Sequence, residues 1–257
     1  MPDKIVHFVG EGVAIVIAET HDQANEAAEL VEVDYEALPP VVRATDAMKP
    51  GATAVWDERP GNVALEAEVG DKAKTDAAFA KAKHVVKFET WINRVTGTPM
   101  EPRNAVGEYD AKNNFYTLYA GTGSGVARER GDLASCLGVP IENVRALCGD
   151  MGGNFGTRNF FFPEYVLAPW AAKKVGRPVK WLGDRTESFV SDYQGRDLTV
   201  EAELALDKDG KFLAIRGTNI SNVGAHTIAF VPLRKGLGQM SGVYDIPAIH
   251  FRGCAVI

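Results

Sequence analysis

The chain has 257 residues and a formal net charge of −6, with 46% hydrophobic and 24% charged residues. This composition is typical of a globular protein long enough for one large domain or two modest ones. The acidic balance excludes a nucleic-acid binder that relies on a basic face. No apolar run reaches the roughly 18 residues of a membrane span, and no secretory signal is visible. The three cysteines, Cys136, Cys148 and Cys254, fit neither a disulfide framework nor a paired-cysteine metal site, so we expect a reduced, cytoplasmic protein.

The first forty residues predict a β-α-β unit. Residues 13–18 form a nearly continuous apolar run, which is typical of a strand buried on both faces. Thr20 followed by Gln23 predicts the start of a helix, and a second strand should follow from residue 31 until two prolines stop it. Residues 43–62 carry Pro and Gly with little periodicity and predict a linker. We therefore expect domains at residues 1–55 and 56–257.

The rest of the chain mixes strand and helix patterns, which predicts an α+β (mixed α/β) fold. Helices are expected at residues 71–82, 126–137 and 163–175. Strands are expected at residues 62–71, 84–95, 107–111, 115–121, 144–148 and 179–185, in a hairpin at 198–224, and towards residue 257.

The strongest local feature is the run GDMGGNFGTRN at residues 149–159. Glycine permits positive φ and a close approach of the backbone to a ligand, and consecutive N–H groups in such a turn form an anion site. The run favours a loop that holds phosphate, pterin or metal-oxo oxygens, although a tight turn without a ligand has the same composition. Its spacing matches neither GxGxxG nor GxxxxGK[ST], so a nicotinamide or nucleoside-triphosphate site is not supported.

A second glycine run, GTGSG at residues 121–125, precedes a predicted helix. A helix N-terminus attracts an anion, but Ser124 is equally suited to be an N-cap. Glu101 and Arg103 predict a structural ion pair, and residues 184–187, DRTE, predict a solvated or cross-domain salt-bridge network. The histidines show no partner at metal-ligand spacing, and no GxSxG motif is present, so a protein-ligated zinc site and serine or cysteine hydrolysis lack support.

Five segments in order resemble one family. Residues 8–42 are similar to the α/β hammerhead segment of molybdenum hydroxylase large subunits, the family of xanthine dehydrogenase, aldehyde oxidase and aerobic carbon monoxide dehydrogenase. Residues 98–110, 137–159, 176–189 and 243–253 resemble successive landmarks of the molybdopterin-binding part that follows, including MEPR and GGNFG. The resemblance covers nearly the whole chain.

This resemblance implies oxidative hydroxylation of aldehydes or N-heterocycles, or oxidation of CO, with oxygen taken from water. Molybdenum would be held by molybdopterin, expected in its cytosine dinucleotide form, and not by protein side chains. The implied cofactor-binding residues are Gly152, Gly153, Asn154, Phe155, Gly156, Ser124 and Gly125. Ser124 stands where the family usually has glutamine. Asn159 stands where xanthine-oxidising members have glutamate, which argues against purine hydroxylation.

The resemblance also implies that this polypeptide is one piece of a large subunit, without the first part of the hammerhead and without the C-terminal half that carries the general base. We therefore expect no catalytic residue in the chain and no cofactor on the chain alone. Expected partners are the remaining large-subunit polypeptide, an iron–sulfur subunit and a flavin subunit, in a homo- or hetero-oligomer. The alternative is a non-catalytic fragment, scaffold or interaction protein that keeps the fold and binds no cofactor.

Overall fold

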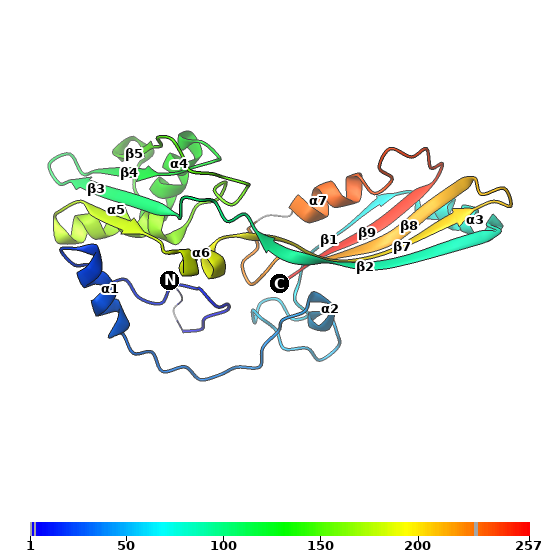
Figure 1. Ribbon diagram of the computed structural model, residues 1–257, viewed down its shortest axis with the longest axis horizontal. Coiled ribbons are helices and arrows are strands. Elements are labelled where there is room, and N and C mark those ends of the chain that lie inside the picture. Colours follow the sequence, from blue (N-terminus) through cyan, green and yellow to red (C-terminus); the bar gives the residue numbers. More distant parts are fainter. Residues whose placement is uncertain (1, 3, 229–230) are drawn as a thin grey trace. The chain divides into compact units, whose positions relative to one another are not determined.

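The computed structural model describes residues 2, 4–228 and 231–257, and the chain divides into two compact units. Unit 1 comprises Met1–Tyr35 and Thr96–Gln194, and unit 2 comprises Glu36–Val95 and Gly195–Ile257. Each unit contains one mixed sheet with helices, so the mixed α/β class is confirmed (Figure 1). The domain boundary expected near residue 55 remains a prediction.

Unit 1 is built on a four-stranded sheet in the order β5-β4-β3-β6, in which only β4 and β5 are parallel. Its elements are α1 (His21–Glu29), β3 (Asn104–Asp110), β4 (Phe115–Ala120), α4 (Val126–Leu137), the 3-10 helix η1 (Ile141–Asn143), β5 (Val144–Leu147), α5 (Pro163–Val175), β6 (Val179–Leu182) and α6 (Arg185–Ser191).

The core of unit 1 lies where α4 and α5 meet this sheet. Leu118 of β4, Leu133 of α4 and Tyr165 of α5 are buried in one cluster with Phe162. Helix α5 begins with Pro at its first position and ends at Gly176 in the left-handed conformation, as its sequence predicts. The predicted helices at 126–137 and 163–175 are both confirmed.

Unit 2 is built on a five-stranded sheet in the order β1-β9-β8-β7-β2. Its elements are α2 (Ala44–Ala47), β1 (Val63–Gly70), α3 (Lys72–Lys81), β2 (His84–Thr96), β7 (Gln194–Leu206), β8 (Phe212–Asn222), α7 (Val231–Gly238) and β9 (Ile249–Val256). The predicted hairpin is confirmed as β7–β8, and Asp207 closes its turn by accepting from the N–H groups of Asp209 and Lys211 at 2.9 Å. Leu233 and Leu237 of α7 pack on Phe251 and Ala255 of β9.

The predicted β-α-β unit at the start of the chain is only partly present. Helix α1 begins after Thr20, whose hydroxyl accepts from the Gln23 N–H at 3.2 Å. Residues 13–18 and 31–42 form no strand, and Val13, Val31 and Val33 are exposed, so the two predicted strands are wrong. A strand needs a neighbour to receive its backbone hydrogen bonds, and neither segment joins a sheet in the described residues.

The segment 43–62, predicted as a linker, contains the short helix α2 and a loop that Asn62 holds in shape, and its role as a linker stays a prediction. Asn62 is fully buried, and its amide donates to the carbonyls of Ala47 at 3.1 Å and Thr53 at 2.8 Å. Its Oδ1 accepts from the Val55 N–H at 2.8 Å. The Asn62 side chain thus provides hydrogen-bond partners for three backbone groups of a segment that has no periodic pattern.

Three α-helices were missed by the sequence patterns: α2, α6 and α7. Helix α6 starts with a capping box, in which Asp184 accepts from the Glu187 N–H at 2.6 Å and Glu187 accepts from the Asp184 N–H at 3.0 Å. The interpretation of DRTE as an ion-pair network is therefore wrong, because its two carboxylates satisfy backbone donors at the helix start.

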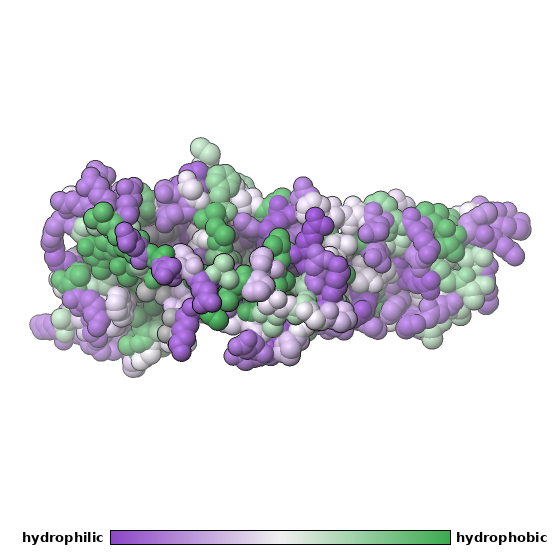
Figure 2. Space-filling model, turned by 90° about the horizontal axis from the view of Figure 1, so that it is seen from below, coloured by the Kyte–Doolittle hydropathy of each residue, from purple (hydrophilic) through white to green (hydrophobic). Residues whose placement is uncertain are grey.

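Large hydrophobic side chains remain exposed in both units, and hydrophobic areas interrupt the polar surface on the face shown in Figure 2. In unit 2 they concentrate on β2, an edge strand of its sheet, where Val86, Phe88 and Trp91 are each more than half exposed. Among the described residues, none of the helices combines the length and the apolar character needed to cross a membrane.

Candidate cofactor site

The two glycine runs come together in unit 1 because β4 and β5 are parallel neighbours. The run at 121–125 follows β4 and the run at 149–159 follows β5, so both leave the same edge of the sheet. The Gly123 N–H donates to the Arg158 carbonyl at 2.8 Å. A Cβ at Gly123 would lie 2.1 Å from Asn154 Nδ2 and 2.2 Å from Asn159 Oδ1, so the contact requires glycine.

Asn154 holds the second loop in shape. Its Oδ1 accepts from the N–H groups of Gly156 at 3.0 Å and Arg158 at 3.3 Å, and its Nδ2 donates to Asn159 Oδ1 at 3.0 Å. Its carbonyl accepts from both the N–H and the hydroxyl of Thr157. Asn159 is therefore engaged inside the loop as a partner of Asn154.

Phe155 sits at the tip of this loop in an unusual conformation. Its φ is +50°, in the region that favours glycine, and 75% of the residue is exposed. Gly153 and Gly156 on either side have φ of +120° and +87°. A Cβ at Gly153 would lie 3.1 Å from the Phe155 ring and from Pro99, so the ring lies close over the glycine. A strained and exposed aromatic residue in a braced loop is typical of a ligand site.

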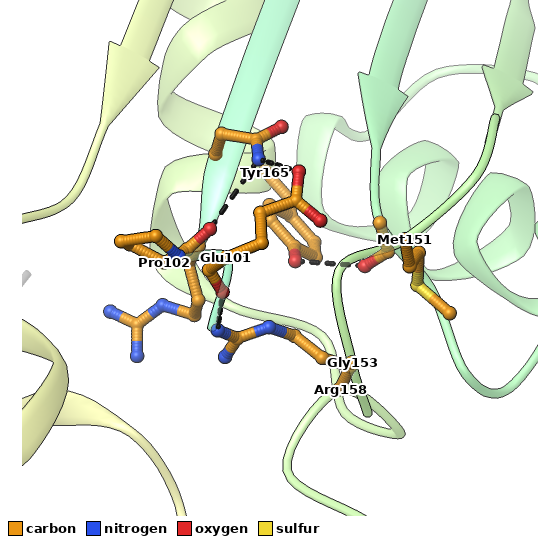
Figure 3. Close-up of a pocket in the computed structure, with 9 residues that line it drawn as sticks. Glu101, Pro102, Met151, Gly153, Arg158 and Tyr165 are labelled. Carbon is orange, nitrogen blue, oxygen red and sulfur yellow. Dashed lines mark hydrogen bonds between the residues drawn. The ribbon is translucent and has the colours of Figure 1, made fainter. Parts of the chain in front are cut away.

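The turn before β3, which contains Glu101, is hydrogen-bonded to the glycine loop. Glu101 Oε2 accepts from the Gly152 N–H at 2.5 Å, and Glu101 Oε1 accepts from Asn104 Nδ2 at 2.8 Å. The Arg158 guanidinium donates to the Glu101 carbonyl at 3.0 Å (Figure 3). The predicted ion pair between Glu101 and Arg103 is wrong, because Arg103 points into the core and pairs with Glu164 and Asp192.

A small pocket lies between this turn and the glycine loop (Figure 3). On one side Tyr165 donates its hydroxyl to the Gly121 carbonyl at 3.0 Å. The pocket is lined by Glu101, Pro102, Arg103, Asn104, Gly121, Met151, Gly153, Arg158 and Tyr165.

Ser124 is not the N-cap of α4. That position belongs to Gly125, with φ of +94°, and no side chain caps this helix. The Ser124 N–H donates to Thr122 Oγ1 at 3.3 Å, and the two hydroxyl oxygens lie 3.3 Å apart. Because no side chain caps α4, its first N–H groups have no side-chain acceptor, and they lie beside the glycine loop.

Glu129, in the first turn of α4, is a site neighbour that the sequence patterns did not single out. It is 2% exposed, and burial raises the pKa of its carboxyl to about 7. The nearby Asp132 raises this pKa further, whereas the Thr122 hydroxyl and Arg128 lower it. A signal was available, because Glu129 lies four residues before the buried Leu133 and so falls on the apolar face of the helix.

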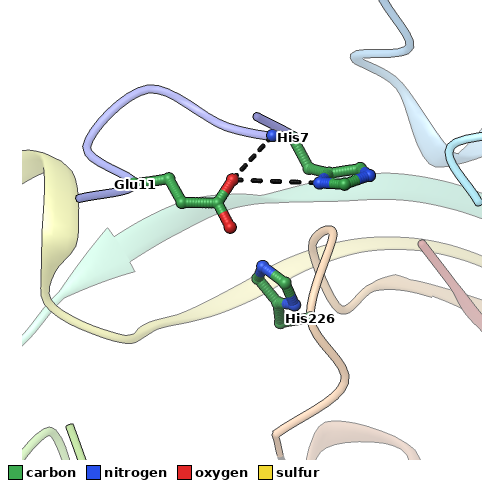
Figure 4. A group of neighbouring side chains, drawn as sticks. All are labelled: His7, Glu11 and His226. Atoms are coloured by element: carbon green, nitrogen blue, oxygen red, sulfur yellow. Dashed lines mark hydrogen bonds and ion pairs between the residues drawn. The ribbon is translucent and has the colours of Figure 1, made fainter. Parts of the chain in front are cut away.

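His7 and Glu11 correct the expectation that no histidine has a carboxylate at ligand spacing. They are four residues apart, and a turn at Gly10, with φ of +102°, brings them together. The His7 backbone N–H donates to Glu11 Oε2 at 2.7 Å, and His7 Nδ1 lies 3.8 Å from the same oxygen (Figure 4). Zinc sites in proteins use three or four protein ligands, so two residues do not make one by themselves, and the contact between them is an ion pair only when His7 is protonated.

Comparisons with known proteins identify two family models that match this chain. The model of the molybdopterin cofactor-binding domain matches residues 55–257, and that of the aldehyde oxidase and xanthine dehydrogenase a/b hammerhead domain matches residues 1–39.

Among curated proteins, the carbon monoxide dehydrogenase large chain of Hydrogenophaga pseudoflava is 35% identical, over 97% of this chain and 33% of the relative. The 6-hydroxypseudooxynicotine dehydrogenase complex subunit gamma of Paenarthrobacter nicotinovorans is also 35% identical, over 96% of this chain and 30% of the relative. Among solved structures, quinoline 2-oxidoreductase from Pseudomonas putida 86 superposes with a TM-score of 0.85 at 30% identity, over 93% of this chain and 30% of that one.

The chain thus spans about a third of the length of the relatives that it matches. The family model covers most of the chain, and the segments identified by resemblance lie within the matched residues except for residues 40–42. The chain therefore belongs to the molybdopterin-binding large-subunit family of the molybdenum hydroxylases.

Proposed function

We propose that unit 1 contributes the glycine-loop wall of the molybdopterin site in a molybdenum hydroxylase large subunit. The observation that carries this proposal is the braced tip of the loop, where Phe155 combines a φ of +50° with 75% exposure. Holding a bulky residue in this region costs on the order of 1–3 kcal/mol, and an exposed ring gains little packing in return. Such a conformation is expected where the ring and its neighbouring N–H groups meet a ligand.

The residues proposed to face the cofactor are those predicted from the sequence: Gly152, Gly153, Asn154, Phe155, Gly156, Ser124 and Gly125. They fit an anionic, oxygen-rich group, because the loop glycines let the backbone approach closely and the start of α4 offers uncapped N–H groups. In this proposal Gly153 and Gly156 set the loop path, Asn154 holds it, and Phe155 excludes water from one side.

The molybdenum cofactor, when bound, supplies the two-electron oxidation with oxygen taken from water. The residues of this chain are proposed to orient and enclose the cofactor. None of them is proposed as the general base. That role calls for a carboxylate within hydrogen-bond reach of the reacting oxygen, which we assign to another part of the enzyme.

The substrate class remains a proposal: an aldehyde, an N-heterocycle or CO. The names of the relatives support this range, since they include carbon monoxide, 6-hydroxypseudooxynicotine and quinoline enzymes. We further propose the cytosine dinucleotide form of the cofactor, a cytoplasmic location, and partners comprising the rest of the large subunit, an iron–sulfur subunit and a flavin subunit. The alternative function, a scaffold that binds no cofactor, makes the opposite prediction for the experiment below.

The test is to produce the complete enzyme around this chain with Phe155→Ala, Gly153→Ala or the control Trp170→Ala, which removes an exposed aromatic ring from α5. We expect both loop variants to lose at least tenfold in turnover. The thermal midpoint should change little in Phe155→Ala, because the ring is exposed, and should fall in Gly153→Ala by the equivalent of roughly 1 kcal/mol of backbone strain. Trp170→Ala should keep its turnover.

Molybdenum content is measured on the same samples. Equal turnover per folded molecule in all variants would contradict the proposal that the loop forms part of the cofactor site. An assembled wild-type enzyme without molybdenum would contradict it as well, and either result would favour the alternative function, a scaffold that binds no cofactor.

A further inference from the structure

Four charged side chains are buried together behind the glycine loop of unit 1. They are Arg103, Arg158, Glu164 and Asp192, each less than 10% exposed. The side chain of Asp192 has no exposed surface, and its two oxygens accept from different arginines: Oδ1 from Arg103 at 2.7 Å and Oδ2 from Arg158 at 3.1 Å. Two positive and two negative charges make the cluster neutral, as burial requires.

The two arginines of this cluster serve different parts of the structure. Arg103 lies 4.2 Å over the ring of Phe162, a core residue, and also pairs with Glu164 and with the Ser191 hydroxyl. Arg158 belongs to the glycine loop itself, and its second terminal nitrogen donates to the Glu101 carbonyl. Arg158 is thus the member of the cluster that lies in the glycine loop, whereas Arg103 lies in the turn before β3.

From Arg158 the contacts continue to the residues proposed to face the cofactor. Glu101, whose carbonyl accepts from Arg158, uses its carboxylate to hold the Gly152 N–H at 2.5 Å. A Cβ at Gly152 would lie 2.5 Å from the Glu101 Cβ, so the two residues are packed closely. The path from Asp192 to Gly152 consists of three hydrogen bonds, which the side chains of Arg158 and Glu101 link to one another.

We propose that Asp192 is a positioning residue of the glycine loop: by orienting the Arg158 guanidinium it fixes Glu101 and, through it, the Gly152 N–H. The inference deepens the proposed function, since the loop is the proposed cofactor wall. Its test measures the loop itself in the chain without any cofactor, so its failure is distinct from a failure of the proposed function.

The experiment compares Asp192→Asn with Glu164→Gln in the 257-residue chain. Each substitution removes one negative charge from the same buried cluster and keeps the side-chain size, but Glu164 contacts Arg103 and not Arg158. Amide hydrogen exchange is followed residue by residue by NMR. We expect the Gly152 amide and the amides of residues 154–158 to exchange at least tenfold faster in Asp192→Asn, and within twofold of wild type in Glu164→Gln.

Arg158→Lys provides a second variant in case Asp192→Asn does not fold. Lysine keeps the charge of the cluster, but its single nitrogen cannot replace the two guanidinium nitrogens that bond Asp192 and the Glu101 carbonyl separately. The same acceleration at Gly152 is expected. Equal acceleration in Glu164→Gln and Asp192→Asn, or an unchanged Gly152 amide in Arg158→Lys, would overturn the proposal and leave the cluster a general support of the core.

Discussion

At the scale of single residues, Glu129 is a carboxyl placed where charge is costly. It is almost completely buried in the first turn of α4, and its Oε2 has no hydrogen-bond partner in the described structure. The charged groups around it are Arg128 and Asp132 on the same helix, while α5 contributes the neutral Tyr165. Because burial dominates, the folded protein favours the protonated acid, with a pKa of about 7 in place of 4.5.

This raised pKa predicts how stability depends on pH. Below pH 4.5 the carboxyl is protonated in both the folded and the unfolded chain, so it contributes no penalty. As the pH rises from 4.5 to 7, the unfolded chain releases the proton first and the free energy of unfolding falls, by about 3 kcal/mol in total. Glu129→Gln, which stays neutral, should therefore be more stable than wild type at pH 8 and equal to it near pH 4.

Urea unfolding at a series of pH values measures this difference. Glu142→Gln is the matched control, because Glu142 lies exposed on η1 and its substitution should leave the pH profile unchanged. A constant offset between Glu129→Gln and wild type from pH 4 to 8 would refute the assignment.

At the scale of elements, unit 1 depends on how closely α5 approaches β3. A Cβ at Gly107 of β3 would lie 2.1 Å from the backbone nitrogen of Pro169 and 2.2 Å from the Ala168 carbonyl carbon. Both are backbone atoms and cannot turn aside as a side chain can. Pro169, which lacks an N–H, thus lies in α5 where the helix touches the strand.

Gly107→Ala should therefore push α5 away from the sheet and cost about 1–3 kcal/mol of unfolding free energy. Gly131→Ala in α4 is the control, since a Cβ there meets nothing within 4 Å and alanine favours a helix. That variant should be neutral or stabilised by up to roughly 1 kcal/mol. If denaturant unfolding gave the two variants the same stability, the close packing of α5 on β3 would be in doubt.

At the scale of the whole molecule, the exposed hydrophobic residues predict association. In unit 2, Val86 and Phe88 alternate along the edge strand β2 and are 54% and 61% exposed. An edge strand with apolar side chains offers another chain both unpaired backbone N–H and C=O groups and an exposed hydrophobic surface.

We expect the 257-residue chain alone to form dimers or larger species, measured by light scattering at increasing concentration. Phe88→Lys should reduce the association, because a charge on the edge strand opposes pairing, while the thermal midpoint stays unchanged. Glu89→Lys, an exposed residue on the opposite face of β2, should have less effect. A wild type that stays monomeric at high concentration would contradict the prediction.

The sequence alone determined the elements that carry strong local signals. Helices α4 and α5 and the β7–β8 hairpin were predicted from periodicity, terminal glycines and turn residues, because these patterns act within a few residues. It also determined the family and the glycine loop, since the motif is contiguous and two of its glycines, Gly153 and Gly156, have positive φ values. Where the same local patterns depended on a partner, as in residues 13–18, the prediction was wrong.

Only the tertiary structure decided which charges meet. Asp192 pairs with Arg158 across 34 residues and with Arg103 across 89, and no periodicity links positions so far apart. Glu101 and Arg103 are two residues apart in the same turn, but Glu101 binds the Gly152 N–H of the glycine loop and Arg103 pairs with the buried Glu164. The physical reason is that burial fixes these partners: a charge removed from water must find an opposite charge wherever the packed chain brings one within reach.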